Sequence, residues 1–469
     1  MLETINSIVA SVSDFMYTYL LIIILVAGGF IFTVATRFAP FRLFKQQIKA
    51  VMEKPKEKNG VSSFQALMVS TASRVGTGNI IGVSTALCMG GFGSVFWMWV
   101  IAIIGSASAF IESTLAQIYK KKGPDGSYGG PAYYIETGLK CKPLAIVFSI
   151  LLIFTYGVGF NMLASYNLQS TFSTYEFYNT TYTPLMIGLI VAVVVCYCLL
   201  GGGKRIEKVT SVLVPVMGLA YILVALVIVF LNLPLLPDVF EKIFSEAFDF
   251  EAIFGGFTGS CVMFGIKRGL FSNEAGVGSA PNASASADVQ HPVKQGLVQV
   301  LSVFIDTVLV CSATAFMCMC SGVEATKELS GAPYVQLALK TALGDFGPIF
   351  ITVAMVFFAF TTLIGNLYYV DKGIAHIIGR VPSKKYMLLV HIVFSLYILC
   401  GSMLNADLLW NVSDILMGGM AIINIPVILI LSKYALRALR DYEKQRKEGK
   451  EPVFKAKNIN LPDKVDYWD

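Results

Sequence analysis

The chain has 469 residues, of which 55% are hydrophobic and 14% are charged, and its mean hydropathy is +0.68. Because soluble domains are roughly 45–50% apolar and about 25% charged, this balance excludes an ordinary water-soluble fold and favours a protein embedded in a lipid bilayer. The net charge of +6 is concentrated in particular loops, which argues against nucleic acid as a partner.

Eleven apolar segments of about 20 residues are long enough to cross the hydrocarbon core as helices, in contact with membrane lipid. They span residues 17–34, 64–89, 95–118, 144–168, 185–200, 209–231, 253–285, 293–320, 349–369, 386–404 and 409–431. No cleavable signal peptide is predicted, because residues 1–15 carry Glu3 and Asp14 in place of a basic leader. The segments predict an all-α integral membrane protein.

Clusters of Lys and Arg follow the first, third, fifth, ninth and last segments, whereas the loops between them are poor in basic residues. The clusters lie within residues 37–58, 120–122, 204–208, 372–385 and 433–447. With eleven spans, all of these loops fall on one side of the membrane, which the positive-inside rule identifies as the cytoplasm. The sequence therefore predicts a multi-pass protein of the cell membrane with its N-terminus outside and its C-terminus inside.

The two halves of the chain have the same number of spans. Residues 61–232 and 253–432 each hold five segments, and residues 233–252 link them on the outer side. Because an odd number of spans turns the second repeat over, the halves form a five-plus-five inverted repeat. Residues 1–60 add an extra N-terminal helix with a basic loop, and residues 433–469 form a basic cytoplasmic tail.

Two stretches outside these segments also carry helical patterns. Residues 331–344 are expected to form a short amphipathic helix on the outer face, in the position of a lid. The tail from Lys433 is expected to be a basic helix, either lying on anionic lipid or solvated.

Two of the segments contain glycine-rich interruptions, at residues 73–82 (S-R-V-G-T-G-N-I-I-G) and 265–278 (G-I-K-R-G-L-F-S-N-E-A-G-V-G). In lipid, an interrupted helix is tolerated only where protein or a water-filled cavity satisfies the freed backbone groups. Interrupted segments in corresponding halves mark the substrate site of a secondary transporter. We therefore predict an ion-coupled carrier for a small solute, with close helix packing as the alternative role of the glycines.

The first interruption supplies amides with positive dipole character, which suit a carboxylate. We expect an amino acid to bind there through Gly76, Thr77, Gly78 and Asn79. The alternative for Asn79 is a hydrogen bond between helices.

The same interruption also frees carbonyl oxygens, which suit a hard cation such as Na+. We expect sodium to bind the carbonyls of Ala72 and Val75, with the hydroxyls of Thr361 and Thr362 from the ninth segment completing its shell. Adjacent threonines also commonly bond back to the carbonyl one turn earlier, which is the alternative for this pair.

Charged residues inside a membrane are costly and usually functional. Arg268 and Glu274 are expected to pair across the second interruption, either to hold its geometry or to form part of an inner gate. Lys267 and Arg268 alternatively mark the cytoplasmic end of a helix. Arg74 either snorkels to the surface or pairs with Asp306.

Three motifs resemble the alanine-or-glycine:cation symporter family. They are V-G-T-G-N-I-I-G-V at 75–83, G-G-F-G-S-V-F-W-M-W at 90–99 and G-I-K-R-G-L-F-S-N-E-A-G-V-G-S-A at 265–280. The resemblance runs from about residue 64 to residue 379. It implies the leucine-transporter-like fold, alternating access around a midplane site, and sodium-coupled, or sometimes proton-coupled, uptake of a small neutral amino acid. It also implies the sodium ligands named above.

Two pocket positions depart from the alanine-transporting pattern. Ala164 stands where those members carry glutamine, and Asn366 stands where they carry tryptophan. Both changes enlarge the pocket, and Asn366 would turn an amide toward the substrate. We therefore expect glutamine or another larger neutral amino acid, unless Tyr166 or Phe271 supplies compensating bulk. Phe271 is the expected apolar wall of the pocket.

Other functional classes fit less well. A channel needs a continuous pore, which a repeat with two interrupted helices does not suggest. An enzyme is not predicted, because no paired His/Asp or H-E-x-x-H pattern is present and the loops are short. The nine cysteines form no metal-binding pattern. Na+ is the expected coupling ion, and no organic cofactor is expected. No pattern indicates an oligomeric state.

Overall fold

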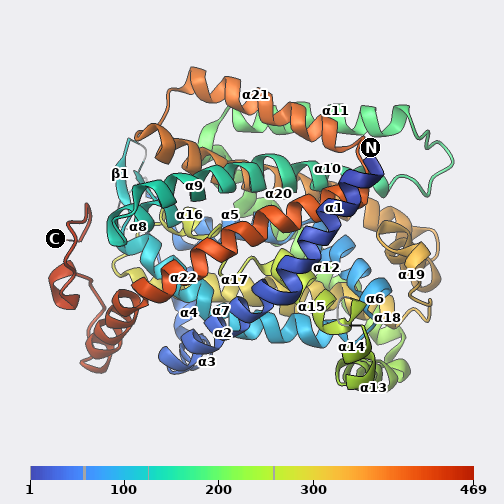
Figure 1. The fold of residues 1–469 in the computed structure, drawn as a ribbon, viewed down its shortest axis with the longest axis horizontal. Coiled ribbons are helices and arrows are strands. Elements are labelled where there is room, and N and C mark those ends of the chain that lie inside the picture. The colour runs from blue at the N-terminus through green and yellow to red at the C-terminus, as the bar shows by residue number, and fades with distance from the viewer. Residues whose placement is uncertain (1, 56, 58–59, 125, 257–258, 469) are drawn as a thin grey trace.

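The computed structural model describes residues 2–55, 57, 60–124, 126–256 and 259–468, and it consists mainly of helices (Figure 1). The helices of the first half are α1 (Leu2–Phe15), α2 (Ile22–Ala35), α3 (Ala39–Arg42), α4 (Phe44–Val51), α5 (Ser63–Arg74), α6 (Val83–Gly90), α7 (Ser94–Ile118), α8 (Pro131–Gly138), α9 (Lys142–Ile153), α10 (Phe160–Ser170), α11 (Tyr182–Leu199) and α12 (Gly202–Leu231). Those of the second half are α13 (Leu236–Ala247), α14 (Phe250–Gly255), α15 (Cys261–Asn273), α16 (Pro281–Ser284), α17 (Pro292–Val303), α18 (Ser312–Met319), α19 (Ala332–Leu343), α20 (Phe346–Ile378), α21 (Lys384–Gly401) and α22 (Ala406–Lys447).

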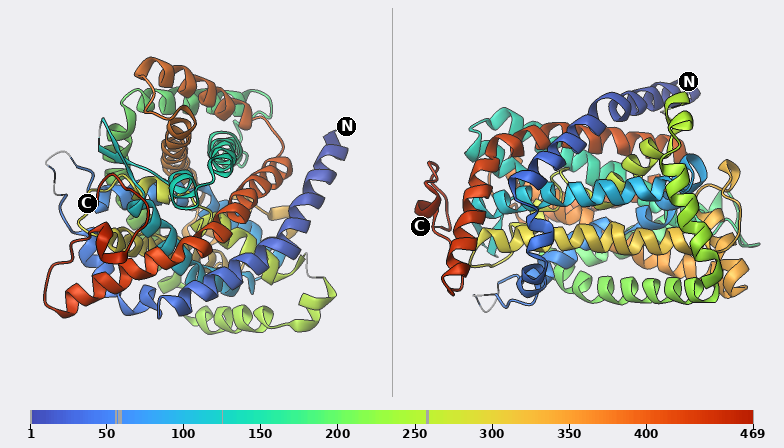
Figure 2. Two further views of the ribbon diagram at one scale, coloured as in Figure 1. Left: turned by 60° about the vertical axis from the view of Figure 1, so that its left-hand side comes forward. Right: turned by 90° about the horizontal axis from the view of Figure 1, so that it is seen from below.

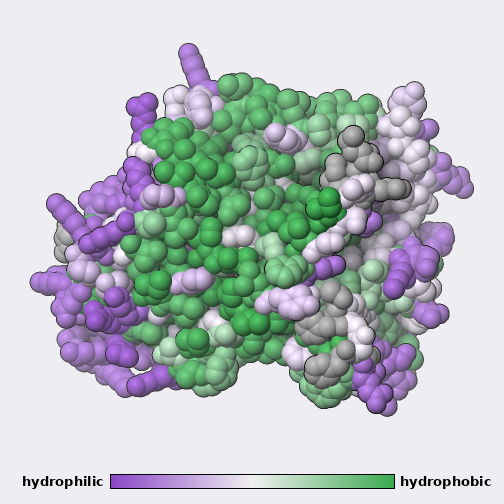
Figure 3. Space-filling model, viewed as in Figure 1, coloured by the Kyte–Doolittle hydropathy of each residue, from purple (hydrophilic) through white to green (hydrophobic). Residues whose placement is uncertain are grey.

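Long apolar helices give the molecule a hydrophobic middle. Among the described residues, nine helices are long and apolar enough to cross a membrane, and each coincides with one of the predicted segments. They are Asn6–Ala35, Ser94–Ile118, Lys142–Ser170, Tyr182–Leu199, Gly202–Leu231, Pro292–Met319, Phe346–Ile378, Lys384–Gly401 and Ala406–Lys447. Hydrophobic residues cover the centre of the view in Figure 3, and hydrophilic residues gather at its left and right ends. This distribution fits a bilayer around the middle of the protein.

The two remaining predicted segments are interrupted, as expected. The first stops at Arg74 and resumes as a π-helical turn over Gly78–Gly82 that continues into α6. The second stops at Asn273 and resumes at Pro281. Such turns are tolerated here because neighbouring helices enclose them.

The expected start of the second interruption was wrong, because residues 265–273 are helical. Gly265 and Gly269 instead allow α15 to approach α7 closely. A Cβ atom would lie 2.6 Å from Trp97 at the first position and 2.6 Å from Ile101 at the second. Small residues four apart on one helix face permit this packing, which is the alternative role considered for the glycines.

Side-chain caps help to define where several helices begin. Ser62 and Gln65 form a reciprocal capping box at the start of α5, since each side chain accepts the backbone N–H of the other. The side chains of Ser383 and Asn405 likewise cap the N-termini of α21 and α22, where they accept backbone N–H groups of the first turn.

The two ends of the molecule carry different elements (Figures 1 and 2). The C-terminus, α3, α4 and an antiparallel hairpin of β1 (Lys121–Gly123) and β2 (Gly126–Tyr128) lie at one end. This hairpin is a small exception to the all-α prediction. Helices α13, α14 and α19 lie at the opposite end.

Both predicted extramembrane helices are present, but each is joined more closely to the rest of the protein than expected. The expected outer helix is α19, but it is largely buried, and Ser84 of α6 donates a hydrogen bond to Gly331 at its start, 2.7 Å away. The expected tail helix is the continuation of α22, which runs for 42 residues without a break.

Candidate functional site

The first interruption is braced by one side chain. Val75 leaves the helical conformation at ψ 89°, and the Asn79 side chain accepts the backbone N–H of Gly76 at 2.8 Å. The amides at Thr77 and Gly78 begin the second half of this helix, where no carbonyl one turn earlier is available to them. The interruption is therefore a fixed kink that presents backbone groups inside the protein.

Asn79 also ties the first interrupted helix to two other helices. Its amide donates to the Ser272 hydroxyl of α15 at 3.0 Å and to the Asp306 carboxylate at 2.7 Å. Asp306 lies in the π-helical turn Phe304–Cys311 that joins α17 to α18, and it also accepts bonds from Ser272 and Thr307. Asn79 thus acts as a bridge between helices, which is the alternative role considered above.

The two interrupted helices meet at Phe271. A Cβ atom at Gly78 would lie 2.9 Å from the Phe271 ring, so glycine allows the contact. The same ring packs on Phe160 of α10 and Trp410 of α22, with centroids 4.6 and 4.8 Å away. Phe271 therefore packs between both interrupted helices and two of their neighbours.

The predicted sodium ligands divide into two groups. A Cβ atom at Gly76 would collide with the Thr362 hydroxyl, and that hydroxyl is buried without a hydrogen-bond partner among the described residues. Thr361 instead donates to the carbonyls of Phe357 and Phe358 at 2.9 and 3.1 Å. The backbone of Ala72, in α5, lies against Gly365 of α20, the helix that carries both threonines. The fold therefore places Thr362 at the interruption, while Thr361 bonds back to its own helix.

Asn366 does not leave its amide free, contrary to the expectation that it faces the substrate. Its carbonyl oxygen accepts from the Ser73 hydroxyl at 2.6 Å, and its NH₂ group donates to Asn161 at 2.9 Å. The amide is used to connect α5, α10 and α20, because polar groups buried in a membrane protein seek partners on neighbouring helices.

Helix α10 carries further polar atoms beside the first interruption. Asn167 donates to the Thr77 hydroxyl at 3.1 Å, and Ala164 is buried on the same helix. The Nδ2 of Asn161, the Oγ of Ser165 and the Oδ1 of Asn167 are buried with no hydrogen-bond partner in the described part of the chain. This helix therefore offers a small side chain at Ala164 and unused hydrogen-bonding groups beside it.

The second interruption is held by backbone conformation. Glu274 has φ 51°, and Gly276 and Gly278 have φ 83° and 90°, values that favour glycine. The Glu274 carboxylate accepts a hydrogen bond from Ser279, so it closes a loop within the interruption.

The expected pair of Arg268 and Glu274 was wrong. Arg268 lies two turns before the interruption, where it binds Asp414 of α22 at 3.1 Å and lies over the Trp410 ring at 4.1 Å. Lys267 binds the same carboxylate at 3.1 Å and so is not a marker of a cytoplasmic helix end. Two cations share one buried carboxylate because α15 and α22 pack side by side at this point.

Arg74 occupies the centre of a second buried charge cluster. Only 2% of it is exposed, so it does not snorkel, and it donates to Gln299 of α17 at 3.2 Å. Its charge acts on Glu112, Glu274 and Asp306, while its Nε and Nη2 have no hydrogen-bond partner among the described residues. One arginine thus faces three carboxylates in the interior.

Several of these residues were not singled out as site residues from the sequence. The signal available was the presence of polar residues within apolar segments, but it did not identify their partners. The residues concerned are Ser73, Asn161, Asn167, Ser272, Gln299 and Asp414.

Comparisons with known proteins agree with this arrangement. Residues 2–456 match the model of the sodium:alanine symporter family. The amino-acid carrier protein AlsT of Bacillus subtilis (strain 168) is 42% identical over 99% of this chain and 98% of its own length. The probable sodium/glutamine symporter GlnT of the same organism is 40% identical over 100% and 97%. The sodium/alanine symporter AgcS of Methanococcus maripaludis is 35% identical over 94% and 98%.

The chain also has structural neighbours with little sequence identity. MhsT, solved with L-phenylalanine, superposes with a TM-score of 0.51 at 15% identity, covering 80% of this chain and 99% of its own. The manganese transporter of Eremococcus coleocola superposes with a TM-score of 0.52 at 13% identity, covering 85% and 84%. These neighbours have the leucine-transporter-like fold.

Proposed function

Because the chain belongs to the sodium:alanine symporter family and is a multi-pass membrane protein, we propose that it couples sodium entry to uptake of a small neutral amino acid by alternating access. The observation that carries the proposal is the contact between the two interrupted helices, where Phe271 packs on Gly78 and Asn79 bonds to Ser272. Backbone groups freed at such a meeting point suit a solute that carries both charges.

The proposed topology has eleven spans. Residues 61–232 and 253–432 form the inverted repeats, residues 233–252 the outer linker, and residues 1–60 the extra helix and its loop. The N-terminus would lie outside, and residues 433–469 in the cytoplasm. The basic loops support this orientation, since the C-terminus, α3, α4 and the hairpin lie at one end of the molecule (Figure 1).

For the coupling ion, we propose a sodium site made by the carbonyls of Ala72 and Val75 with the Thr362 hydroxyl. The unpartnered, buried Thr362 oxygen supports the site, because an unsatisfied buried hydroxyl costs about 1–3 kcal/mol that a bound cation can recover. Thr361 donates to carbonyls of its own helix, and it is Thr362 that lies against Gly76 at the interruption, so we propose Thr361 as the weaker ligand.

For the substrate, we propose that the carboxylate meets the amides around Gly76, Thr77 and Gly78, with Phe271 as the apolar wall. The small Ala164 and the unpartnered Asn161, Ser165 and Asn167 atoms support a substrate whose side chain carries its own polar group. Glutamine is the leading candidate because its amide can both donate and accept. The relative named as a probable sodium/glutamine symporter supports the same assignment.

In place of the inner gate expected for Arg268, we propose an outer gate at the cluster around Asp414. Arg268 and Lys267 from the second interrupted helix bind this carboxylate, and Trp410 and Phe271 lie beside it. Access from outside would require α15 and α22 to separate at this point. Glu274 would hold the shape of the second interruption.

Proton coupling is the second candidate. Arg74 lies near three buried carboxyl groups, those of Glu112, Glu274 and Asp306, and burial favours the protonated form of such groups, so they are candidates to carry protons. One relative is named a putative sodium/proton-dependent alanine carrier.

The test uses purified protein in liposomes with an imposed sodium gradient and labelled alanine, glycine and glutamine. We expect sodium-dependent, saturable uptake in which glutamine competes with alanine. Uptake driven by a pH gradient and indifferent to sodium would overturn the sodium assignment. Strong alanine uptake without glutamine uptake would overturn the glutamine assignment.

A variant pair sharpens the substrate assignment. Ala164→Gln restores the bulk of the alanine-transporting pattern and should shift preference from glutamine toward alanine. Ala192→Gln, on α11, is the control for adding a glutamine to an apolar helix away from the site. An unchanged preference in Ala164→Gln would remove this residue from the pocket.

A further inference from the structure

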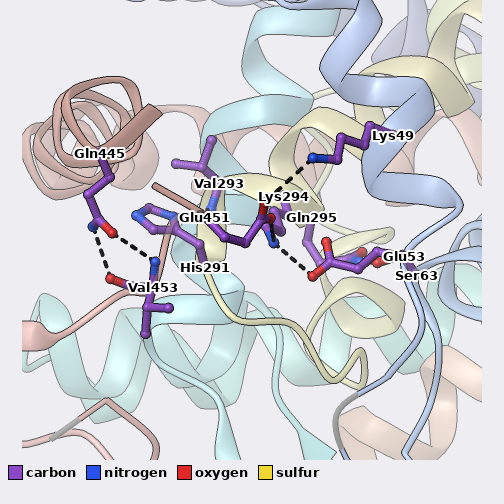
Figure 4. Close-up of polar contacts among 10 residues, drawn as sticks. All are labelled: Lys49, Glu53, Ser63, His291, Val293, Lys294, Gln295, Gln445, Glu451 and Val453. Atoms are coloured by element: carbon purple, nitrogen blue, oxygen red, sulfur yellow. Dashed lines mark hydrogen bonds and ion pairs between the residues drawn. The ribbon is translucent and has the colours of Figure 1, made fainter. Parts of the chain in front are cut away.

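The chain beyond α22 reverses and packs against the end of the molecule that carries the C-terminus. Residues 450–468, called here the strap, bury Phe454, Ile459, Val465 and Trp468. The reversal is held by Gln445, whose amide exchanges two 2.9 Å hydrogen bonds with the backbone of Val453 (Figure 4). A short polar tail would not bury four apolar side chains, so the strap is a docked structural element.

The strap docks on the segment that follows the second interrupted helix. The backbone N–H of Phe454 donates to the carbonyl of Gln290 at 3.0 Å. The Trp468 indole donates to the carbonyl of Gln117 at 2.8 Å, at the end of α7. Lys120 lies 4.7 Å from the Tyr467 ring centroid and 5.0 Å from that of Trp468. The strap therefore covers residues 285–291, which join α16 to α17.

The covered segment is also bound to the start of the first interrupted helix. Val61 forms a parallel bridge with Ala287, and its carbonyl accepts the N–H of Asp288 at 2.9 Å. Gln117 and Lys120 both donate to the carbonyl of Ala287, at 2.9 and 3.1 Å. These bonds hold the same ends of both interrupted helices together under the strap.

A buried lysine adds an ionic link between the three parts (Figure 4). Lys294 of α17 is 3% exposed and binds Glu53, ahead of α5, at 2.7 Å and Glu451 of the strap at 2.9 Å. Lys49 approaches Glu451 at 3.5 Å. A buried cation requires its partners, so removing either end of this link leaves charge uncompensated.

We propose that the strap is a latch that holds the inner ends of the two interrupted helices together and sets how readily the carrier opens to the cytoplasm. This inference rests on the proposed function, because release of solute inward requires those inner ends to separate. Opening must then break the Lys294–Glu451 pair and free the Trp468–Gln117 bond. The strap has no part in binding solute or sodium.

The test is hydrogen–deuterium exchange on the full-length protein in lipid nanodiscs. Lys294→Gln removes the ionic link, and Trp468→Ala removes the indole bond by an independent route. In both variants we expect exchange to become about tenfold faster at residues 60–66 and 285–291, because these amides exchange when the inner ends open. The control is Lys450→Gln, which removes an ion pair with Glu448 whose side chains are 67% and 39% exposed.

Two outcomes would overturn the latch. One is unchanged exchange at residues 60–66 and 285–291 in both variants. The other is an equal acceleration in Lys450→Gln, which would show that the effect does not depend on the Lys294–Glu451 and Trp468–Gln117 contacts. Failure of the wild-type protein to transport any amino acid in liposomes would count against the proposed function alone, because the exchange experiment needs no substrate.

A transport measurement completes the test. In liposomes preloaded with amino acid, efflux that enters the carrier through its cytoplasmic face should become faster in Lys294→Gln and Trp468→Ala. The sodium concentration for half-maximal transport should be unchanged. A shift in sodium half-activation would instead place the strap in the binding of the ion and contradict its role as a latch.

Discussion

The two interrupted helices stop for different physical reasons. The first loses helical conformation over only residues 75–76, and the Asn79 side chain holds it in place through the N–H of Gly76. The second is open over residues 274–280 and is held by three residues with positive φ. Glycine is needed for space in the first and for conformation in the second.

This difference suggests different roles: the first interruption as the proposed binding surface, and the second as a structural element, called here the frame. At the first interruption, Gly76 and Gly78 let Thr362 and Phe271 touch the backbone, so an added methyl group would collide with these proposed site residues. At the second, Glu274 bonds to Ser279 within the interruption itself. Changes at the first should therefore affect binding, and changes at the second should affect stability.

The largest expected effect concerns the anchor of the second helix. Asp414→Ala leaves Arg268 buried without its carboxylate, while Lys267 keeps its contacts with Asp14, Ser13 and the Tyr17 ring. Removing one partner of a buried ion pair costs about 3–5 kcal/mol, so the thermal unfolding midpoint should fall strongly. Asp345→Ala, whose pair with Lys340 is exposed, is the control and should leave the midpoint unchanged.

The next effect tests space at the first interruption. Gly76→Ala places a methyl group against the Thr362 hydroxyl, and overpacking of this kind costs about 1–3 kcal/mol. Uptake should fall by about tenfold or more, with sodium half-activation raised. Gly218→Ala, in α12 with open space around it, should transport normally. Normal uptake by Gly76→Ala would show that the contact is not part of the site.

Backbone conformation at the second interruption is tested by Gly276→Ala. An alanine at φ 83° is strained by about 1–2 kcal/mol, and its Cβ would also meet Ile425. The unfolding midpoint should fall while the apparent affinities for sodium and substrate change little. A variant with a normal midpoint but weakened binding would reverse the assignment of frame and binding surface.

A smaller effect separates the two threonines of α20. Thr362→Ala removes the unpartnered hydroxyl and should raise the sodium concentration for half-maximal uptake by about fivefold to tenfold, corresponding to about 1–1.4 kcal/mol. Thr361→Ala should have the weaker effect, because its hydroxyl already bonds to its own helix. Equal shifts in the two variants would show that both threonines bind the ion.

The smallest effect is a pH dependence at the inner end of the second interrupted region. Burial lowers the pKa of His291 below its ordinary value of about 6.5, against the opposing pull of Asp441. His291 packs against Phe454 of the strap, so the protein with its strap docked binds a proton at His291 less readily than the protein with its strap undocked. The docking free energy is complete above about pH 6.5 and decreases as the pH falls below it.

Trypsin cleavage of the lysines in the strap measures this dependence, and it should be modestly faster at pH 5.5 than at pH 7.5, relative to an unfolded reference peptide. His291→Gln cannot take up the proton and should abolish the difference. A pH difference of the same size in that variant would exclude His291 as its source.

The sequence alone determined the apolar spans and the position of the first interruption to within a few residues, whereas the second interruption begins nine residues later than predicted, at residue 274 in place of 265. Hydropathy is a local property, and lipid requires each span to satisfy its own backbone, so these features can be read without knowing any contact. Phe271 is predicted to be an apolar wall from its place near the second interruption, but its contact with Gly78 of the first is known only from the tertiary structure.

Only the tertiary structure decided which polar groups meet. Arg268 binds Asp414, far away in the sequence, in place of the nearby Glu274. The Asn366 side-chain amide forms hydrogen bonds with Ser73 and Asn161. The strap likewise reaches α7 and α17 from the end of the chain. A residue type states what bonds it can form, but the choice of partner depends on how helices far apart in the chain are packed against one another.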